Sequence, residues 1–209
     1  HTDVFAFDPN TQRWELATPL LNPRGAAAAA VIDGLVYLVG GVNGEGVTAE
    51  LSVYDPIRDE WGAGPPMPTA REHLATAAIN GKLYVAGGRV GSIDRNLDTL
   101  EIYDPTAGTW SSGPPMPTAR GGIAGATLGE LLVVVGGERT GGTFHEVEAF
   151  DTRRRQWLTL APLPSPRHGL AAVGTVRQLY TIGGGKRPGL SVSSANEVLT
   201  VSPVATGTR

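Results

Sequence analysis

Four arginines recur through the chain at a nearly constant distance. They stand at positions 24, 71, 120 and 167, with spacings of 47, 49 and 47 residues. A guanidinium group stays protonated and presents a flat fork of donors that matches a carboxylate or a phosphate. If they lie together, Arg24, Arg71, Arg120 and Arg167 are candidate ligand-binding residues for an anion. Their fixed place in a repeat equally fits a structural hydrogen-bonding role, which we keep as the alternative.

Histidines and acids close to these arginines could supply acid–base chemistry. Glu72, His73, Glu138 and His145 would be the candidate acid and base if the chain were an enzyme. No pair of histidines has a metal-ligand spacing, and the absence of Cys excludes thiolate metal sites. No nucleophile elbow, H-E-x-x-H motif or dinucleotide fingerprint occurs. We therefore predict no catalytic residue, no metal site and no cofactor.

The elements that must position these residues repeat with them. Gly-Gly pairs start at 40, 87, 136 and 183, and tryptophans stand at 14, 61, 110 and 157, with the same three spacings. Each unit holds four short runs: a small-residue run after the Arg, a run that stops at Gly-Gly, a run that ends in aromatic-Asp, and a run with the Trp. Asp33-Gly34 and Asn80-Gly81 separate the first two runs and indicate tight hairpins. The sequence thus predicts four strands per unit, named a, b, c and d.

The order Gly-Gly, Tyr-Asp and a Trp six residues later, with a period near 50, resembles the Kelch repeat from Thr2 to about Pro203. The resemblance implies an all-β fold, a Kelch-type β-propeller of four-stranded antiparallel blades around an axis, with about four blades present. The alanine-rich run 25–30 has high helix propensity, but its place in the repeat puts it on strand a, where blades crowd the axis. We expect a strand there.

The strand count leaves the closure of the propeller open. Strands c and d of a first blade fall in residues 1–23, and complete repeats in 24–70, 71–119 and 120–166. Residues 167–209 hold strands a, b and c of a last repeat. We treat the chain as one propeller segment and expect a fragment of a larger propeller. The alternative is a closed four-blade ring, in which the last strand competes with residues 2–8 for one place.

Length variation within the repeat points to one face. The distances from Asp to Trp, from Trp to Arg and from Arg to Gly-Gly are constant, and only the b–c loop varies. Variable loops on a rigid scaffold commonly carry binding specificity. Because strands alternate in direction, the b–c and d–a loops emerge on one face, the loop face. There we add Arg89, His73, Arg139 and His168 to the repeat arginines as candidate ligand-binding residues.

Composition excludes several classes of protein. A formal net charge of −3 argues against a general nucleic-acid binder. No apolar run approaches the ~18 residues that span a bilayer, so we expect no membrane partner. Nine bases and five acids in the d–a and b–c loops predict a locally positive loop face. The compartment is left open.

We therefore predict a binding module whose partner is a protein, a peptide or a glycan, with an acidic peptide or acidic sugar as the ligand. In Kelch domains that bind peptides, Arg at the repeat position and in adjoining loops can contact acidic ligands, and the resemblance implies this only for the four matching arginines. The alternative is a Kelch-type carbohydrate-active enzyme similar to a sialic-acid mutarotase. Copper oxidases of the galactose-oxidase type use a Cys-linked Tyr, which a chain without Cys does not have. A structural module beside a catalytic domain is the third possibility.

Overall fold

Strands are the only regular secondary structure in the residues that the computed structural model describes, 2–200. The end of the last repeat, residues 201–209, lies outside them. No helix in residues 2–200 has the length and apolar character to cross a membrane. The predicted all-β class is therefore confirmed.

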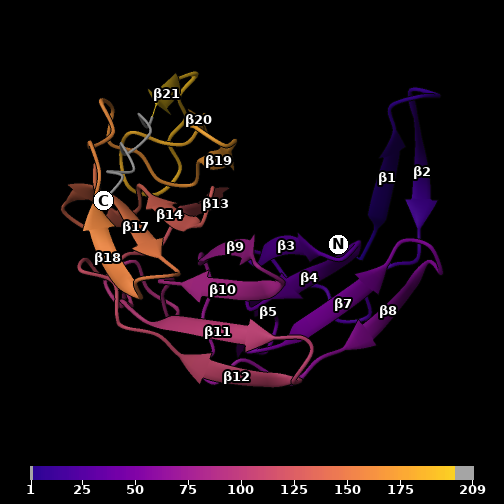
Figure 1. Ribbon diagram of the computed structural model, residues 1–209. Helices are drawn as coiled ribbons and strands as arrows, with labels where there is room; N and C mark the ends of the chain where they lie inside the picture. Colours follow the sequence, from indigo (N-terminus) through magenta and orange to yellow (C-terminus); the bar gives the residue numbers. More distant parts are fainter. Residues whose placement is uncertain (1, 201–209) are drawn as a thin grey trace.

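Four antiparallel sheets follow one another around a common axis and form the blades of a β-propeller (Figure 1). Blade 1 contains β3 (Ala28–Ile32), β4 (Leu35–Val39), β7 (Leu51–Asp55) and β8 (Glu60–Ala63). Blade 2 contains β9 (Ala75–Ile79), β10 (Lys82–Ala86), β11 (Leu100–Asp104) and β12 (Thr109–Ser112). Blade 3 contains β13 (Ala124–Leu128), β14 (Leu131–Val135), β17 (Val147–Asp151) and β18 (Gln156–Thr159). Blade 4 contains β19 (Ala171–Gly174), β20 (Gln178–Ile182) and β21 (Asn196–Thr200).

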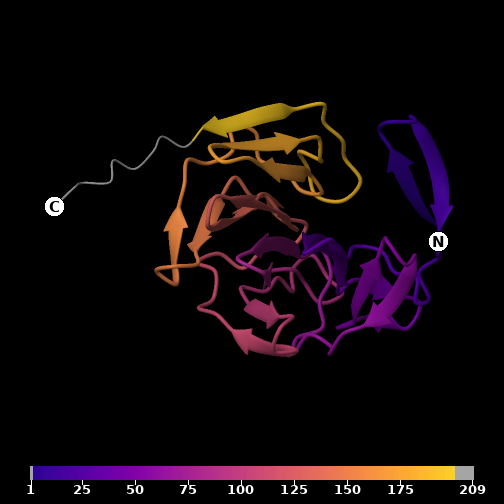
Figure 2. The ribbon, with the colours of Figure 1, turned by 45° about the vertical axis from the view of Figure 1, so that its right-hand side comes forward.

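The remaining strands form three small hairpins. β1 (Val4–Asp8) pairs with β2 (Arg13–Ala17), and both Figures 1 and 2 show this hairpin apart from blade 4. In blade 4 the third place belongs to β21, which pairs with β20, so β1 does not take it. The other two hairpins lie inside b–c loops: β5 (Val42–Asn43) with β6 (Gly46–Val47), and β15 (Glu138–Arg139) with β16 (Gly142–Thr143).

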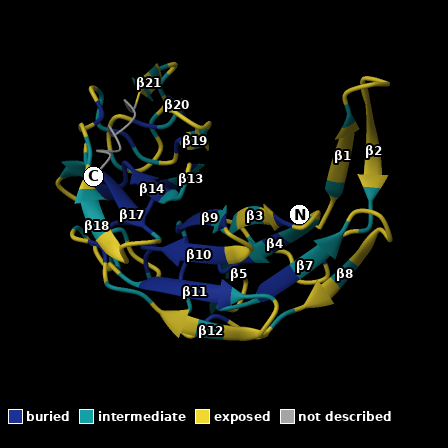
Figure 3. Cartoon of the chain, in the orientation of Figure 1, coloured by how far each residue is buried: buried dark blue, intermediate teal, exposed yellow. Residues whose placement is uncertain are grey.

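Local sequence explains the inner strands. Asp33 and Gly34, like Asn80 and Gly81, both have positive φ, as the tight turn between strands a and b requires. The alanine-rich run forms β3, so tertiary packing overrides its helix propensity, as expected. Small side chains of β3, β9, β13 and β19 line an open hollow of ≈570 Å³ at the axis. Figure 3 shows that burial is deepest in the middle strands of blades 2 and 3.

The tryptophans join each blade to the one before it. The indole N–H of Trp61, Trp110 and Trp157 donates to the carbonyl oxygen of Thr18, Pro65 and Pro114, at 2.8–2.9 Å. Each acceptor lies four residues after the preceding Trp. The same rings stack on the strand-c aromatic, with centroids 5.1 Å apart for Tyr103 and Trp110. Because strand d is the outer strand, these rings are half-buried and not core.

Candidate functional site

The repeat arginines lie inside the blades. The side chains of all four are 0% exposed. Arg71 donates to the carbonyl oxygen of Val85 (3.1 Å), and Arg120 to those of Gly136 (2.9 Å) and Glu146 (2.8 Å). These donors therefore bind the chain itself, and the geometry favours the structural role.

Each repeat arginine also pairs with a glutamate at the start of strand c. The pairs are Arg24–Glu50 (3.3 Å), Arg71–Glu101, Arg120–Glu148 (2.7 Å) and Arg167–Glu197 (2.6 Å). Burial lowers the pKa of Arg71 and Arg120, and the attraction of Glu101 and Glu148 opposes that shift. An arginine keeps its proton even so. The four positive charges are thus neutralised within the fold.

Two repeat positions build the loop face in every blade. The residue after the Arg forms a backbone bridge with the residue after Gly-Gly: Gly25 with Val42, Glu72 with Arg89, Gly121 with Glu138, and His168 with Gly185. In blade 2 the two N–H···O bonds of this bridge measure 3.0 and 2.9 Å. The backbone therefore holds whatever side chains stand at these positions at equivalent places around the axis.

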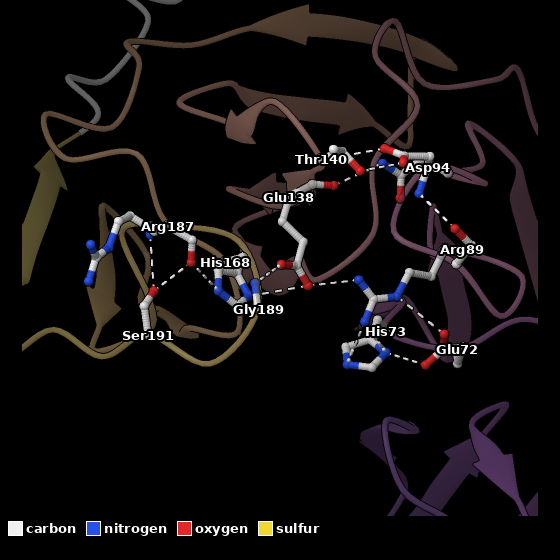
Figure 4. Close-up of polar contacts among 12 residues, drawn as sticks. Glu72, His73, Arg89, Asp94, Glu138, Thr140, His168, Arg187, Gly189 and Ser191 are labelled. Atoms are coloured by element: carbon white, nitrogen blue, oxygen red, sulfur yellow. Dashed lines mark hydrogen bonds and ion pairs between the residues drawn. The ribbon is translucent and has the colours of Figure 1, made fainter.

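A chain of charged side chains crosses three blades from these positions (Figure 4). We call Glu72, His73, Arg89, Glu138 and His168 the loop-face cluster. Arg89 Nε donates to Glu72 Oε1 (3.2 Å), and Arg89 Nη1 donates to Glu138 Oε1 (2.7 Å). His168 Nδ1 lies 3.4 Å from the same Glu138 oxygen, and His73 Nδ1 contacts Glu72. Within the cluster Arg89 bridges the carboxylates of Glu72 and Glu138, and the cluster links blades 2, 3 and 4.

Glu138 is the centre of the cluster. Burial acts to raise its pKa, but the N–H of Gly189, the guanidinium of Arg89 and the nearby His168 bring the pKa below the ordinary glutamate value. The Gly189 N–H donates to Oε2 at 2.8 Å, so both carboxylate oxygens are occupied. An ionised, fully bonded carboxylate has no proton to donate near neutral pH. The arrangement suits Glu138 to holding loops in place.

His73 is the most accessible member of the cluster, with 35% of its side chain exposed. Its backbone has φ +53°, and its N–H donates to the Ala26 carbonyl oxygen of blade 1 at 2.8 Å. A non-glycine residue in this region marks a place where the surroundings hold the backbone firmly. His145 is separate: it is exposed and lies 3.9 Å from Glu146. Of the four residues considered for acid–base chemistry, Glu72, His73 and Glu138 therefore lie together in the cluster, and His145 lies outside it.

Aligning the repeats would have revealed most of this cluster from the sequence. Arg89 and Glu138 both follow Gly-Gly directly, and Glu72 and His168 both follow a repeat Arg. The glutamates that pair with the arginines carry a weaker signal. Glu101 and Glu148 stand three residues before the strand-c Asp, but blade 1 has Ser52 there and uses Glu50. In residues 2–200 no group of three or more His, Asp or Glu is placed to hold a metal ion.

The repeats and the blades agree with comparisons to known proteins. A family model described as the KLHDC2/KLHL20/DRC7 Kelch-repeats domain matches residues 1–184. The chain belongs to the Kelch-repeat family. The solved structure of YjhT has a similar fold, with a TM-score of 0.81 and 24% sequence identity over 94% of this chain and 75% of YjhT. A comparison with curated proteins gives no match.

Burial divides the cations on the loop face of this Kelch protein into two groups. Arg24, Arg71, Arg89, Arg120 and Arg167 form ion pairs inside the protein. Arg95, Arg139, Lys186 and Arg187 are exposed and form no ion pair with any described residue. The exposed loop acids are Glu45, Asp94 and Asp98. The exposed excess is therefore smaller than the nine bases and five acids of the sequence indicate.

Three of the four exposed cations lie on one side of the Kelch protein's loop face, and Arg95 lies apart from them in the b–c loop of blade 2. Arg139 belongs to the b–c loop of blade 3, and its guanidinium lies 5.1 Å from the centre of the Phe144 ring. Lys186 and Arg187 belong to the b–c loop of blade 4, which Thr143 Oγ1 joins by donating to the Lys186 carbonyl oxygen (3.2 Å). The exposed acids belong to the loops of blades 1 and 2, but Asp94 reaches the hairpin of blade 3, where the N–H of Thr140 donates to its Oδ1 (2.9 Å). Most of the exposed positive charge of the face therefore lies on the side of blades 3 and 4.

Proposed function

We propose that this Kelch propeller binds an anionic protein, peptide or glycan through the loop face, on the side of blades 3 and 4. A Kelch propeller supports a binding role in general, and the observation that supports the finer proposal is the group Arg139, Lys186 and Arg187. These side chains are exposed and form no ion pair with any residue from 2 to 200. Arginine in particular suits carboxylates, because its donors form a planar fork.

The repeat arginines have a supporting role in this proposal. Their charges are neutralised by Glu50, Glu101, Glu148 and Glu197, so they hold the d–a loops against strand c and leave ligand contact to the exposed cations. The loop-face cluster supports the loops in the same way but closer to the surface, because Glu138 connects Arg89, His168 and Gly189. Of the candidate ligand-binding residues, Arg139 and the exposed edge of His73 are best placed to touch a ligand.

The test removes three charges from the proposed site. Binding is measured on an array of acidic peptides and acidic glycans, with Arg139, Lys186 and Arg187 changed together to Gln. The control changes Arg13, Arg155 and Arg177 to Gln, since these exposed cations lie in or directly beside the a–b and c–d turns of the opposite face. We expect binding to fall roughly tenfold or more in the first variant only. Binding should also weaken with salt, because exposed charges are screened over ~8 Å at physiological ionic strength.

Equal loss in the two variants would show a general charge effect and would contradict the proposal. So would binding that is unchanged in both variants while the ligand remains anionic.

A further inference from the structure

The b–c loop of blade 4 exposes two aliphatic side chains beside two cations. Leu190 is 109% exposed and Val192 is 92% exposed. Lys186 and Arg187 precede them in the same loop and are also exposed. We call residues 186–192 the blade-4 tip. Aliphatic side chains held fully in water add little to the stability of the fold, and the other b–c loops of the face expose no large aliphatic side chain in this way.

The blade-4 tip is held in one conformation by bonds to the loop-face cluster. The Gly189 N–H donates to the buried Glu138 carboxylate (2.8 Å), and His168 Nε2 donates to the Arg187 carbonyl oxygen (3.1 Å). Within the tip, the Arg187 N–H donates to Ser191 Oγ (3.0 Å), and that hydroxyl donates back to the Arg187 carbonyl oxygen (2.5 Å). Because these bonds already order the tip, the loop loses little conformational entropy when a partner binds to it.

We infer that the blade-4 tip is a docking element for a protein segment that carries apolar side chains next to Asp or Glu. This inference rests on the proposed function and names its ligand class. Burial of Leu190 and Val192 against apolar groups of a partner removes their apolar surface from water, which favours binding. A glycan offers mainly hydroxyl groups and would leave that gain unused. A peptide supplies both apolar groups and carboxylates.

The surroundings of the tip fit such a segment. An open hollow of ≈620 Å³ lies beside it, lined by Lys186, Val192, Ser193 and Ser194. One cation, one aliphatic side chain and two hydroxyl-bearing residues thus border the same space. Arg139 is on the neighbouring hairpin, which Thr143 ties to Lys186. An acidic residue of the segment has cations on both sides, and its apolar residue has Val192 and Leu190.

The experiment selects ligands without assuming one. A random-peptide phage library is panned on the chain, and the enriched peptides are synthesised and titrated by fluorescence anisotropy. We expect them to combine apolar residues with Asp or Glu. The double variant Leu190→Ser with Val192→Ser should weaken their binding roughly tenfold or more. The matched control is Ile57→Ser with Val176→Ser, which removes two equally exposed aliphatic side chains from turns of the opposite face and should change affinity less than about twofold.

The outcomes separate this inference from the proposed function. If the cation variant loses the peptides and the Leu190–Val192 variant keeps them, the anionic site stands and the docking element is overturned. If acidic glycans bind on the array and no peptide is enriched, the inference fails and the proposed function survives. If neither peptides nor glycans bind, both fail.

A second readout tests whether Glu138 positions the tip. Glu138→Gln removes the charge that holds the Gly189 N–H while keeping the side chain's size. The Gly189 amide should then exchange with solvent several-fold faster, and the selected peptides should bind several-fold more weakly. An unchanged exchange rate together with an unchanged affinity would show that Glu138 does not position the tip.

Discussion

At the scale of single residues, the repeat arginines are the most heavily buried charges among the described residues, and in blades 2 and 3 their glutamates are buried with them. Arg120 is 0% exposed and Glu148 is 3% exposed. A buried ion pair gives little net stability, because desolvation of both charges offsets their attraction. Breaking such a pair is costly, since one charge is left buried without a partner. The pair therefore acts as a requirement for correct assembly of each blade.

This asymmetry gives a prediction for Arg120. Arg120→Ala should lower the free energy of unfolding by about 3–5 kcal/mol, because Glu148 stays buried and the Gly136 and Glu146 carbonyl oxygens lose their donor. Arg120→Met with Glu148→Leu should recover much of that loss. Both are measured by denaturant titration. The exposed Arg139→Ala serves as control, with an expected change within about 0.5 kcal/mol. A loss below about 1 kcal/mol in Arg120→Ala would contradict the structural role of the pair.

The sequence predicted the four repeat arginines as equivalent residues but did not predict the glutamates that pair with them. The spacing of Arg71 and Arg120 marked them as equivalent, and their two possible roles could not be separated without burial. Burial depends on where Glu101 and Glu148 lie in three dimensions, and their distance from the arginines along the chain changes with the b–c loop. Likewise Arg89 was foreseen as a ligand contact, but Glu72 and Glu138 occupy its donors.

At the scale of elements, the Gly-Gly pairs decide how closely successive blades approach. The N–H of the second glycine donates to the carbonyl oxygen of the next blade's repeat arginine, as from Gly137 to Arg167 (2.8 Å). In the pairs that start at 40, 87 and 136, the first glycine leaves no room for a side chain. A Cβ on Gly136 would lie 2.3 Å from the Arg167 carbonyl oxygen, and the residue has φ +67°. Conformation and space both require glycine there.

Gly136→Ala therefore has a clear expected cost, about 2–4 kcal/mol in thermal or denaturant unfolding. Gly129→Ala is the matched control. It lies in the turn between β13 and β14 of the same blade with φ +61°, but a Cβ there meets no atom within 4 Å. The control should cost only the left-handed backbone penalty, about 1–2 kcal/mol. Equal losses at the two glycines would mean that blade spacing tolerates the methyl group.

Most elements could be predicted, because hairpin turns, Gly-Gly and Trp act locally and recur in register. Strands a to d occur in the predicted order, including β3 in the alanine-rich run. The hairpins β5–β6 and β15–β16 were not foreseen, since two-residue strands have no periodicity to detect. The degree of burial of the tryptophans does not follow from their spacing: they are half-buried because strand d lies at the rim.

At the scale of the whole molecule, exposed apolar side chains form one group on the β1–β2 hairpin and another on the strands of blade 4. On the β1–β2 hairpin, Phe5, Phe7, Trp14 and Leu16 are exposed, and Trp14 reaches 65%. On blade 4, Val173, Ile182 and Val198 are exposed as well. Figures 1 and 2 show the hairpin and this blade at opposite ends of the succession of sheets. Apolar patches of this kind favour association.

We therefore expect the chain to self-associate as its concentration rises. Trp14→Gln with Leu16→Gln should shift the distribution toward monomer in analytical ultracentrifugation. Ile57→Gln, which changes an isolated exposed side chain in a turn, should not. A chain that stays monomeric at high concentration without these changes would contradict the expectation.

The backbone bridges of the loop face have a consequence for how new specificity could arise. They join the residue after the Arg to the residue after Gly-Gly through main-chain atoms alone, and they hold Gly with Val in blade 1, Glu with Arg in blade 2, Gly with Glu in blade 3 and His with Gly in blade 4. The side chains at these bridged positions can therefore change without disturbing the formation of the blades. Blade 1 has room for a side chain at this bridge, since a Cβ on Gly25 meets no atom within 4 Å. An acid or a base engineered at Gly25 and Val42 would extend the loop-face cluster into a fourth blade. Natural substitutions could change the side chains of this face in the same way, one bridge at a time.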